Sequence, residues 1–241
     1  MQLTFSEAVN FSSVLVDGIT LLDSRNTTNE TVSVQEVTLD SASLTMVTSL
    51  TELTILLTDT DLNMIKAFPE FASDESNTFL LVAEGGVADF AGNLYNTSDT
   101  IQAIRVDPDN TNPELVSYEF NLNASLLTLL FSETVNGSSL DVTGLTFQGE
   151  EIYRTGQRYT LVSSQTESVN SPVITIQLST EDTNSLKQLP DVANDISSTF
   201  LVVRENTVLD TSGNPISPIS DIMARRTQLY VADRILSLIH I

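Results

Sequence analysis

The chain has no cysteine, no tryptophan and one histidine, and its ten lysine and arginine residues face 32 acidic ones. The lack of cysteine excludes disulfides and thiolate chemistry. Because the only histidine is His240, next to the last residue, the chain offers no histidine base for nucleophilic catalysis. The formal net charge of -22 repels phosphate backbones, so it argues against a nucleic-acid partner and fits a solvated acidic surface.

Long apolar runs and phosphate-binding loops are also missing from the sequence. No run approaches the ~18 apolar residues of a membrane span, which predicts no membrane insertion. The Gly85-Gly86 pair is followed by Val87 and Ala88 and reads as a turn rather than a phosphate loop. Paired carboxylates leave an acidic hydrolase as one alternative, but no motif marks a concave site for it. We therefore predict that the chain is not an enzyme.

One sequence unit occurs twice in the chain. Residues 3–10 read LTFSEAVN and residues 129–136 read LLFSETVN. Each copy is followed by an Asp-x-x-Gly-Asn motif, at residues 89–93 and 210–214. Internal self-similarity of this kind indicates a repeat architecture, so the chain is one structural unit used about twice.

Short strands account for most of both copies. Apolar runs bounded by Gly, Asn, Ser and Pro predict strands, and residues 132–139 have the composition of a turn. The predicted strands are 32–39, 53–57, 79–83 and 102–106 in the first copy, and 115–120, 127–131, 144–147, 159–162, 173–178, 200–203 and 227–231 in the second. About seven short strands in roughly 120 residues are typical of a β-sandwich.

One segment of each copy departs from the strand pattern. Residues 61–67 and 182–189 place apolar side chains at helical spacing, which predicts one short helix in each copy. Thr, Ser and Asp side chains cap helix starts, and proline ends helices. The predicted caps and stops are Thr58 or Asp59 with Pro69, and Thr180 with Pro190.

The repeat and the composition together predict the domain boundaries. Residues 107–112 contain Asp, Asn, Thr and Pro but no apolar side chain, so they form a short linker between domains 1–106 and 113–234. The first copy begins inside its opening strand, so we expect a domain without its first strand and a chain that is a fragment of a larger protein. Residues 236–241 match nothing in the repeat and resemble a translated sequencing adapter, so we expect a non-native tail at 235–241. The alternative is a natural apolar tail that forms an edge strand.

The order of the two motifs resembles that in the Ig-like repeats of surface-layer and other large cell-surface proteins. A Phe-Ser-Glu-x-Val segment opens each copy at residues 5–9 and 131–135, and Asp-x-x-Gly-Asn follows some eighty residues later. The resemblance covers nearly the whole chain. It implies an all-β fold of two tandem Ig-like β-sandwich domains, each with a short helix inserted between strands, in an extracellular or cell-surface protein.

Calcium is the one cofactor that the sequence suggests, beside the alternative that there is none. Hard oxygen ligands at a domain junction suit Ca²⁺ and would stiffen the array. The first predicted ligand set is the linker group Asp107, Asp109, Asn110 and Asn112, and the second is the recurring group Glu7, Asp89, Glu133 and Asp210. The competing interpretations are a solvated polar hinge for the first set and, for the aspartates of the second, tight turns in which Asp accepts backbone N–H groups.

The function that these observations favour is structural or adhesive. We expect a spacer or contact module whose partners are neighbouring repeats of the same protein and a cell-surface protein or glycan. The alternative is a carbohydrate-binding or accessory module of a secreted glycoside-active protein. The absence of tryptophan and the presence of only five tyrosines argue against that alternative, because sugar platforms need exposed aromatic rings.

Overall fold

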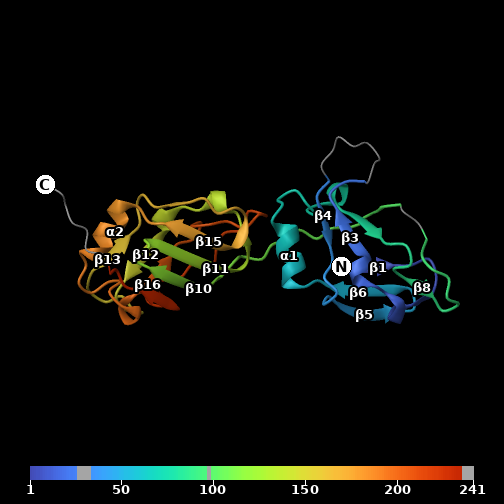
Figure 1. The fold of residues 1–241 in the computed structure, drawn as a ribbon, viewed down its shortest axis with the longest axis horizontal. Helices are drawn as coiled ribbons and strands as arrows, with labels where there is room; N and C mark the ends of the chain where they lie inside the picture. The colour runs from blue at the N-terminus through green and yellow to red at the C-terminus, as the bar shows by residue number, and fades with distance from the viewer. Residues whose placement is uncertain (26–33, 97–98, 235–241) are drawn as a thin grey trace. The chain divides into compact units, whose positions relative to one another are not determined.

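The computed structural model describes residues 1–25, 34–96 and 99–234. The chain forms two compact units, Met1–Asp109 and Asn110–Ile241, whose division falls within the predicted linker 107–112 (Figure 1). The described residues form several sheets and only two α-helices, which agrees with the predicted β-rich class. The predicted tail 235–241, with His240, lies outside the described residues, as do residues 26–33 and 97–98.

The second unit is built from two sheets. Side chains that alternate between buried and exposed along β10 and β11 show that one face of their sheet lies on a core. The first sheet has the order β14 (Gln165–Thr166), β15 (Ser171–Gln177), β11 (Leu126–Val135), β10 (Leu115–Asn121) and β18 (Leu229–Val231). The second has the order β13 (Arg158–Thr160), β12 (Leu145–Gln148), β16 (Phe200–Val203) and β17 (Arg225–Arg226).

Both sheets of the second unit contribute to one hydrophobic core. Phe120 of β10 and Phe147 of β12 are fully buried, and their ring centroids lie 4.9 Å apart. Tyr118 of β10 packs edge-on against Phe147, and its hydroxyl donates to the Thr199 carbonyl at 2.8 Å. The two sheets therefore pack over a shared core, as in a sandwich.

The first unit repeats this plan with three strands in place of five in the first sheet. Its sheets have the orders β1 (Gln2–Thr4), β6 (Glu52–Leu56), β5 (Leu44–Ser49), and β4 (Glu36–Thr38), β3 (Ile19–Leu22), β7 (Phe79–Val82), β9 (Ile101–Gln102), with a small pair of β2 (Val9–Asn10) and β8 (Ala88–Asp89). Its main core cluster includes the fully buried Leu53 and Ile55 of β6 with Ile19 of β3. Within the described residues, nothing in this unit corresponds to β10 and β18 of the second.

Each unit carries one short α-helix where the sequence predicts it. Helix α1 spans Asp59–Lys66 and α2 spans Thr180–Lys187. Thr58 caps α1, as predicted, through a bond from the Asp61 backbone N–H. The predicted cap of α2 is wrong by one residue, because Ser179 accepts the Asp182 N–H at 3.0 Å and Thr180 is already helical. Neither helix is long and apolar enough to cross a membrane.

Within the described residues, the connections contain six 3-10 turns. Several of them begin with an Asn or Asp whose side chain accepts a backbone N–H two residues later, which is how these residues start a turn. They are η1 (Phe11–Ser13), η2 (Val16–Gly18) and η3 (Glu75–Asn77) in the first unit, and η4 (Gly137–Ser139), η5 (Val142–Gly144) and η6 (Ile196–Ser198) in the second.

Two predicted boundaries are wrong for reasons of strand pairing. Residues 132–135 are not part of the predicted turn, because β11 continues to Val135, which pairs with Ser171. The predicted strand 102–106 is reduced to β9, which ends at Gln102. In the second unit the corresponding late segment forms β18 by pairing with β10, and the described first unit has no such neighbour. β5 and β14, which pair with β6 and β15, lie outside the predicted strands.

Candidate functional site

The two Asp-x-x-Gly-Asn motifs are tight turns with the same hydrogen bonds. Asp210 Oδ1 accepts the backbone N–H of Asn214 at 2.7 Å, and Asn214 Nδ2 donates to Asp210 Oδ2 at 2.8 Å. In the first unit, Asp89 accepts the corresponding bonds from Asn93 at 2.8 and 2.6 Å. The glycine of each turn has a positive φ, which a residue with a Cβ rarely adopts. This geometry agrees with the turn interpretation of the aspartates.

Hydrogen bonding keeps the Asp89 carboxylate ionised. The bond from the Asn93 side chain, followed by those from the backbone, holds the pKa of Asp89 below its ordinary value. Because the acceptor positions serve the turn, Asp89 has a structural role that needs no ligand.

The second unit brings two of the predicted metal residues together. Carboxylate oxygens of Glu133 and Asp210 lie within 4.8 Å of one another. Both residues are buried, with exposures of 8% and 2%. Carboxylate oxygens are donors of the kind that suits Ca²⁺. The pair has the chemistry of a partial calcium site.

The first unit does not reproduce this burial. Its corresponding residues, Glu7 and Asp89, are exposed and half-buried. The backbone pairing is nevertheless the same in both units, because Val9 pairs with Asp89 as Val135 pairs with Asp210. The sequence predicted Glu7 and Glu133 as equivalents, and the structure distinguishes them by their burial.

The linker residues of the first predicted set have individual roles. Asp109 forms an ion pair with Lys66 at 2.7 Å. Asp107 pairs with the Arg105 guanidinium, and both side chains are about three-quarters exposed, so this pair adds little stability. Asn110 and Asn112 are exposed. Both aspartates thus have a basic partner within their own unit.

Two further aspartates recur between the copies, and both organise a loop around a helix start. The Asp182 carboxylate accepts the Tyr159 hydroxyl at 2.8 Å, the Ser164 hydroxyl at 2.5 Å and two backbone N–H groups. Burial alone would raise the pKa of the Asp182 carboxyl. The hydrogen bonds, led by that from Ser164, lower the pKa by more than burial raises it, so the pKa lies below its ordinary value. Asp61 does the same with Ser43 and the Asp40 N–H. Both residues are structural anchors.

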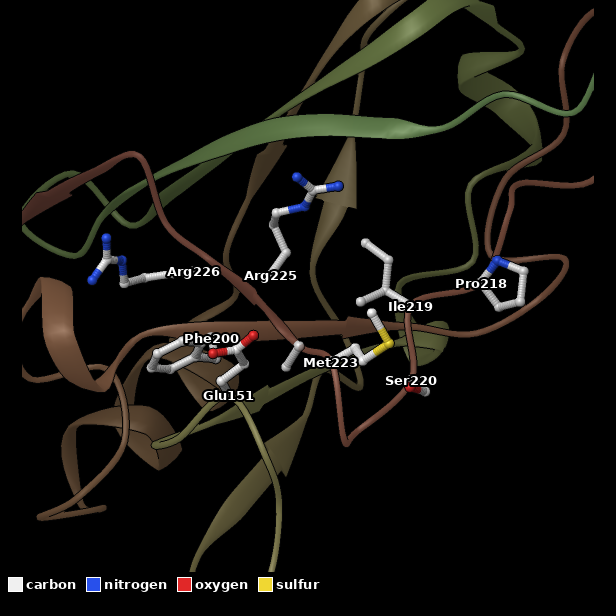
Figure 2. A pocket seen from close by; sticks show the side chains of 9 residues that line it. Glu151, Phe200, Pro218, Ile219, Ser220, Met223, Arg225 and Arg226 are labelled. Carbon is white, nitrogen blue, oxygen red and sulfur yellow. The ribbon is translucent and has the colours of Figure 1, made fainter.

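A pocket that the sequence analysis missed lies in the second unit, with a volume of about 680 Å³. Apolar and charged side chains share its lining, including Glu151, Phe200, Ile219, Met223, Arg225 and Arg226 (Figure 2). The two guanidinium groups point in different directions, since Arg225 and Arg226 are consecutive in β17. The Arg225-Arg226 doublet could have indicated this pocket in the sequence, because basic residues are scarce in the chain.

The pocket offers binding rather than acid–base chemistry. Phe200 is the only aromatic residue of its lining, and Glu151 is the only carboxylate. A site of this kind can hold a small polar or anionic group against an apolar wall.

Comparisons with known proteins give the chain no relative, since no protein-family model, curated protein or solved structure matches it.

Proposed function

We propose that the chain is a mechanical spacer module, built of two tandem Ig-like β-sandwich repeats, in a large extracellular or cell-surface protein. The single observation that carries this proposal is the parallel pairing of β10 with β18, the first and last strands of the second unit. Glu119, Phe120 and Asn121 lie opposite Leu229, Tyr230 and Val231.

Parallel pairing of the terminal strands decides how the unit responds to tension. The chain enters at the start of β10 and leaves at the end of β18, so a pull on both ends drags the two strands in opposite directions. The backbone bonds between them are then loaded together instead of one after another. Two more bonds flank the pair, from the Gln228 N–H to the Tyr118 carbonyl at 2.8 Å and from the Leu122 N–H to the Val231 carbonyl at 2.9 Å.

Side chains fasten the terminal strand to the rest of the unit. The Tyr230 ring lies 6.1 Å from that of Phe120, and its hydroxyl donates to the Ala193 carbonyl at 2.8 Å. Lys187 of α2 forms an ion pair with Asp233 just after β18, at 2.7 Å. Extraction of β18 must therefore break backbone, aromatic and ionic contacts at once.

The remaining support for the spacer function comes from the sequence. Tandem copies joined by a short polar linker suit a protein that extends from a surface, and the motif order resembles that of surface-layer Ig-like repeats. The net charge of -22 keeps such a surface solvated. Neighbouring repeats of the same protein are the proposed partners.

The pocket of Figure 2 favours a second candidate function, a module that contacts glycans. Its arginines and Phe200 suit an acidic sugar better than a neutral one, because guanidinium groups pair with carboxylates. Titration calorimetry with acidic and neutral oligosaccharides tests this candidate. Binding that is lost in Arg225→Ala would support it over a purely mechanical role.

Single-molecule pulling tests the mechanical proposal, and the absence of cysteine allows handles at chosen positions. Handles at Glu114→Cys and Ala232→Cys load the β10–β18 pair in shear. Handles at Glu114→Cys and Gln228→Cys pull the same pair apart from one end. We expect a several-fold higher unfolding force in shear and, in the shear arrangement, a length gain of about 400 Å from roughly 120 released residues. Equal forces in the two directions would refute the mechanical role.

A further inference from the structure

Strand β5 lies at an edge of the β1–β6–β5 sheet of the first unit, and within the described residues it pairs only with β6 (Figure 1). Ile55 of β6 exchanges backbone bonds of 2.8 and 2.9 Å with Met1, so its N–H and C=O groups point away from β5. Its partner in β5, Thr45, therefore occupies a position without bonds to β6. The backbone groups of Thr45 and, two residues later, of Val47 point outward from the sheet.

This edge belongs to the complete repeat, because the second unit has an edge strand in the same place. There β14 pairs with β15 in the register in which β5 pairs with β6. β14 ends after two residues, and side chains then serve the next backbone groups of β15. The Thr175 carbonyl accepts the Thr166 hydroxyl at 2.7 Å, and the Thr175 N–H donates to Ser168 Oγ at 3.0 Å. The second unit thus keeps its edge strand short, which protects it from pairing with another chain.

β5 lacks the features that protect an edge strand. Its six residues are all exposed and include no charged residue and no proline. Leu44, Met46 and Val47 are 67%, 55% and 58% exposed. Val47 lies on the core side of the sheet, because its partner Leu53 is fully buried. Since side chains alternate along a strand, Leu44 and Met46 lie on the opposite face. A strand that pairs with β5 therefore meets apolar side chains on both faces.

Charge decides which chains can approach this edge. The first unit carries 17 acidic and three basic residues, and a second copy of the chain brings a net charge of -22. The basic residues are engaged elsewhere, since Lys66 and Arg105 form ion pairs with aspartates and the Arg25 guanidinium lies over an aromatic ring. In the sequence, β5 stands between Asp40 and Glu52. A second copy is thus repelled, and a neutral or basic segment is favoured.

We propose that the outer edge of β5 is a strand-acceptor site, which binds an extended neutral or basic segment of another protein antiparallel to β5. The segment bonds to the outward N–H and C=O groups of Thr45 and Val47 and carries apolar residues at alternate positions. Those residues cover Met46 on one face of the sheet and Val47 on the other. This interaction surface goes beyond the proposed spacer function and does not depend on it.

A labelled synthetic peptide tests the proposal on the whole chain. The peptide has the sequence of residues 52–58, which already pair antiparallel with β5 at its inner edge, with Glu52 replaced by lysine and one lysine added at the C-terminus. Fluorescence anisotropy measures its binding. We expect saturable binding at one site per chain, weaker binding of the peptide with glutamate at both ends at low salt, and none when its Leu53 and Ile55 are replaced by aspartate. Absence of saturable binding would overturn the proposal.

Two substitutions of one residue locate the site. Thr45→Pro removes an outward N–H from β5 and keeps the bonds to β6, which an edge strand tolerates. Thr45→Val is the matched control, because it keeps this N–H and nearly the same side-chain shape. We expect about a tenfold loss of affinity in Thr45→Pro and no change in Thr45→Val. Equal affinities of the two variants would overturn the site.

Hydrogen exchange and sedimentation distinguish the other outcomes. In the parent protein, the peptide should slow exchange at the amides of Thr45 and Val47, a test that does not depend on the folding of any variant. Protection confined to β1 would place the peptide at the opposite edge of the sheet, and the proposal would be wrong. A dimer of the free chain that Thr45→Pro dissolves would assign the β5 edge to a second copy and also overturn it.

Discussion

Replacement of Phe120 by alanine should destabilise the second unit alone. The side chain is fully buried, its ring lies 4.9 Å from that of Phe147 and 6.1 Å from that of Tyr230, and its strand pairs with both β11 and β18. Truncation of a buried phenylalanine costs about 3–5 kcal/mol, because it removes apolar burial and leaves a cavity. With a urea m-value of about 2 kcal/mol/M, the unfolding midpoint should fall by roughly 2 M.

Tyrosine fluorescence is the natural assay for this variant. The chain has no tryptophan, and Tyr95 is the only one of its five tyrosines in the first unit. The signal therefore follows the second unit during urea unfolding of the whole chain. Val169→Ala is the control in the same unit, since Val169 is 79% exposed, and it should leave the midpoint unchanged. A loss below about 1 kcal/mol in Phe120→Ala would refute the packing described for the two sheets.

Three other predictions concern Gly144, Asp182 and the pair of Glu133 and Asp210. Gly144→Ala should lower the free energy of unfolding in urea by about 1–3 kcal/mol, because the new Cβ would lie 2.0 Å from Thr207 Oγ1. In the control Gly18→Ala the nearest atom to the new Cβ is 3.5 Å away, so the free energy of unfolding should hardly change. Equal effects of the two substitutions would contradict this geometry. The pKa of Asp182 is lower in the folded protein than in the unfolded chain, so the ionised carboxylate stabilises the fold above the unfolded pKa of ~3.9 and this contribution is lost as the pH falls through the folded pKa. Below pH 5, the urea midpoint should therefore decline less in Asp182→Ala than in the parent protein. Parallel declines would contradict this role of Asp182. Calcium should raise the melting temperature of the second unit, because a ligand at 100 times its Kd adds about 2.7 kcal/mol to the free energy of unfolding. Glu133→Gln should abolish this rise. No rise, or an equal rise with magnesium, would show that Glu133 and Asp210 do not bind calcium specifically.

Local chemistry made the helices and turns predictable. Each helix has a polar cap directly before its first residue and a proline shortly after its last, signals that operate within a few residues. The Asp-x-x-Gly-Asn turns are equally local, because Asp89 and Asp210 bond residues two and four positions later. Among the predicted helix caps only that of α2 was misplaced, since Ser179 and Thr180 have the same capping chemistry.

Strand pairing produced the errors, because a partner strand lies far away in the sequence. β5 has exposed side chains on both faces, so no alternation marks it, and it forms because β6 pairs with it. The strand predicted at 102–106 has suitable residues but no counterpart of β10 beside it in the described structure. The pocket at Arg225 and Arg226 was not predicted for the same reason, because its lining comes from segments far apart in the sequence.

The sequence by itself determined that one unit is used twice, which element types each copy contains, and where the two copies meet, because repetition, periodicity and turn chemistry are all properties of neighbouring residues. Only the tertiary structure decided which strands are neighbours, that β10 and β18 run parallel, and that Glu133 is buried while Glu7 is exposed. These features depend on contacts between residues far apart in the chain, and two nearly identical motifs acquire different surroundings when one has an extra strand beside it and the other does not.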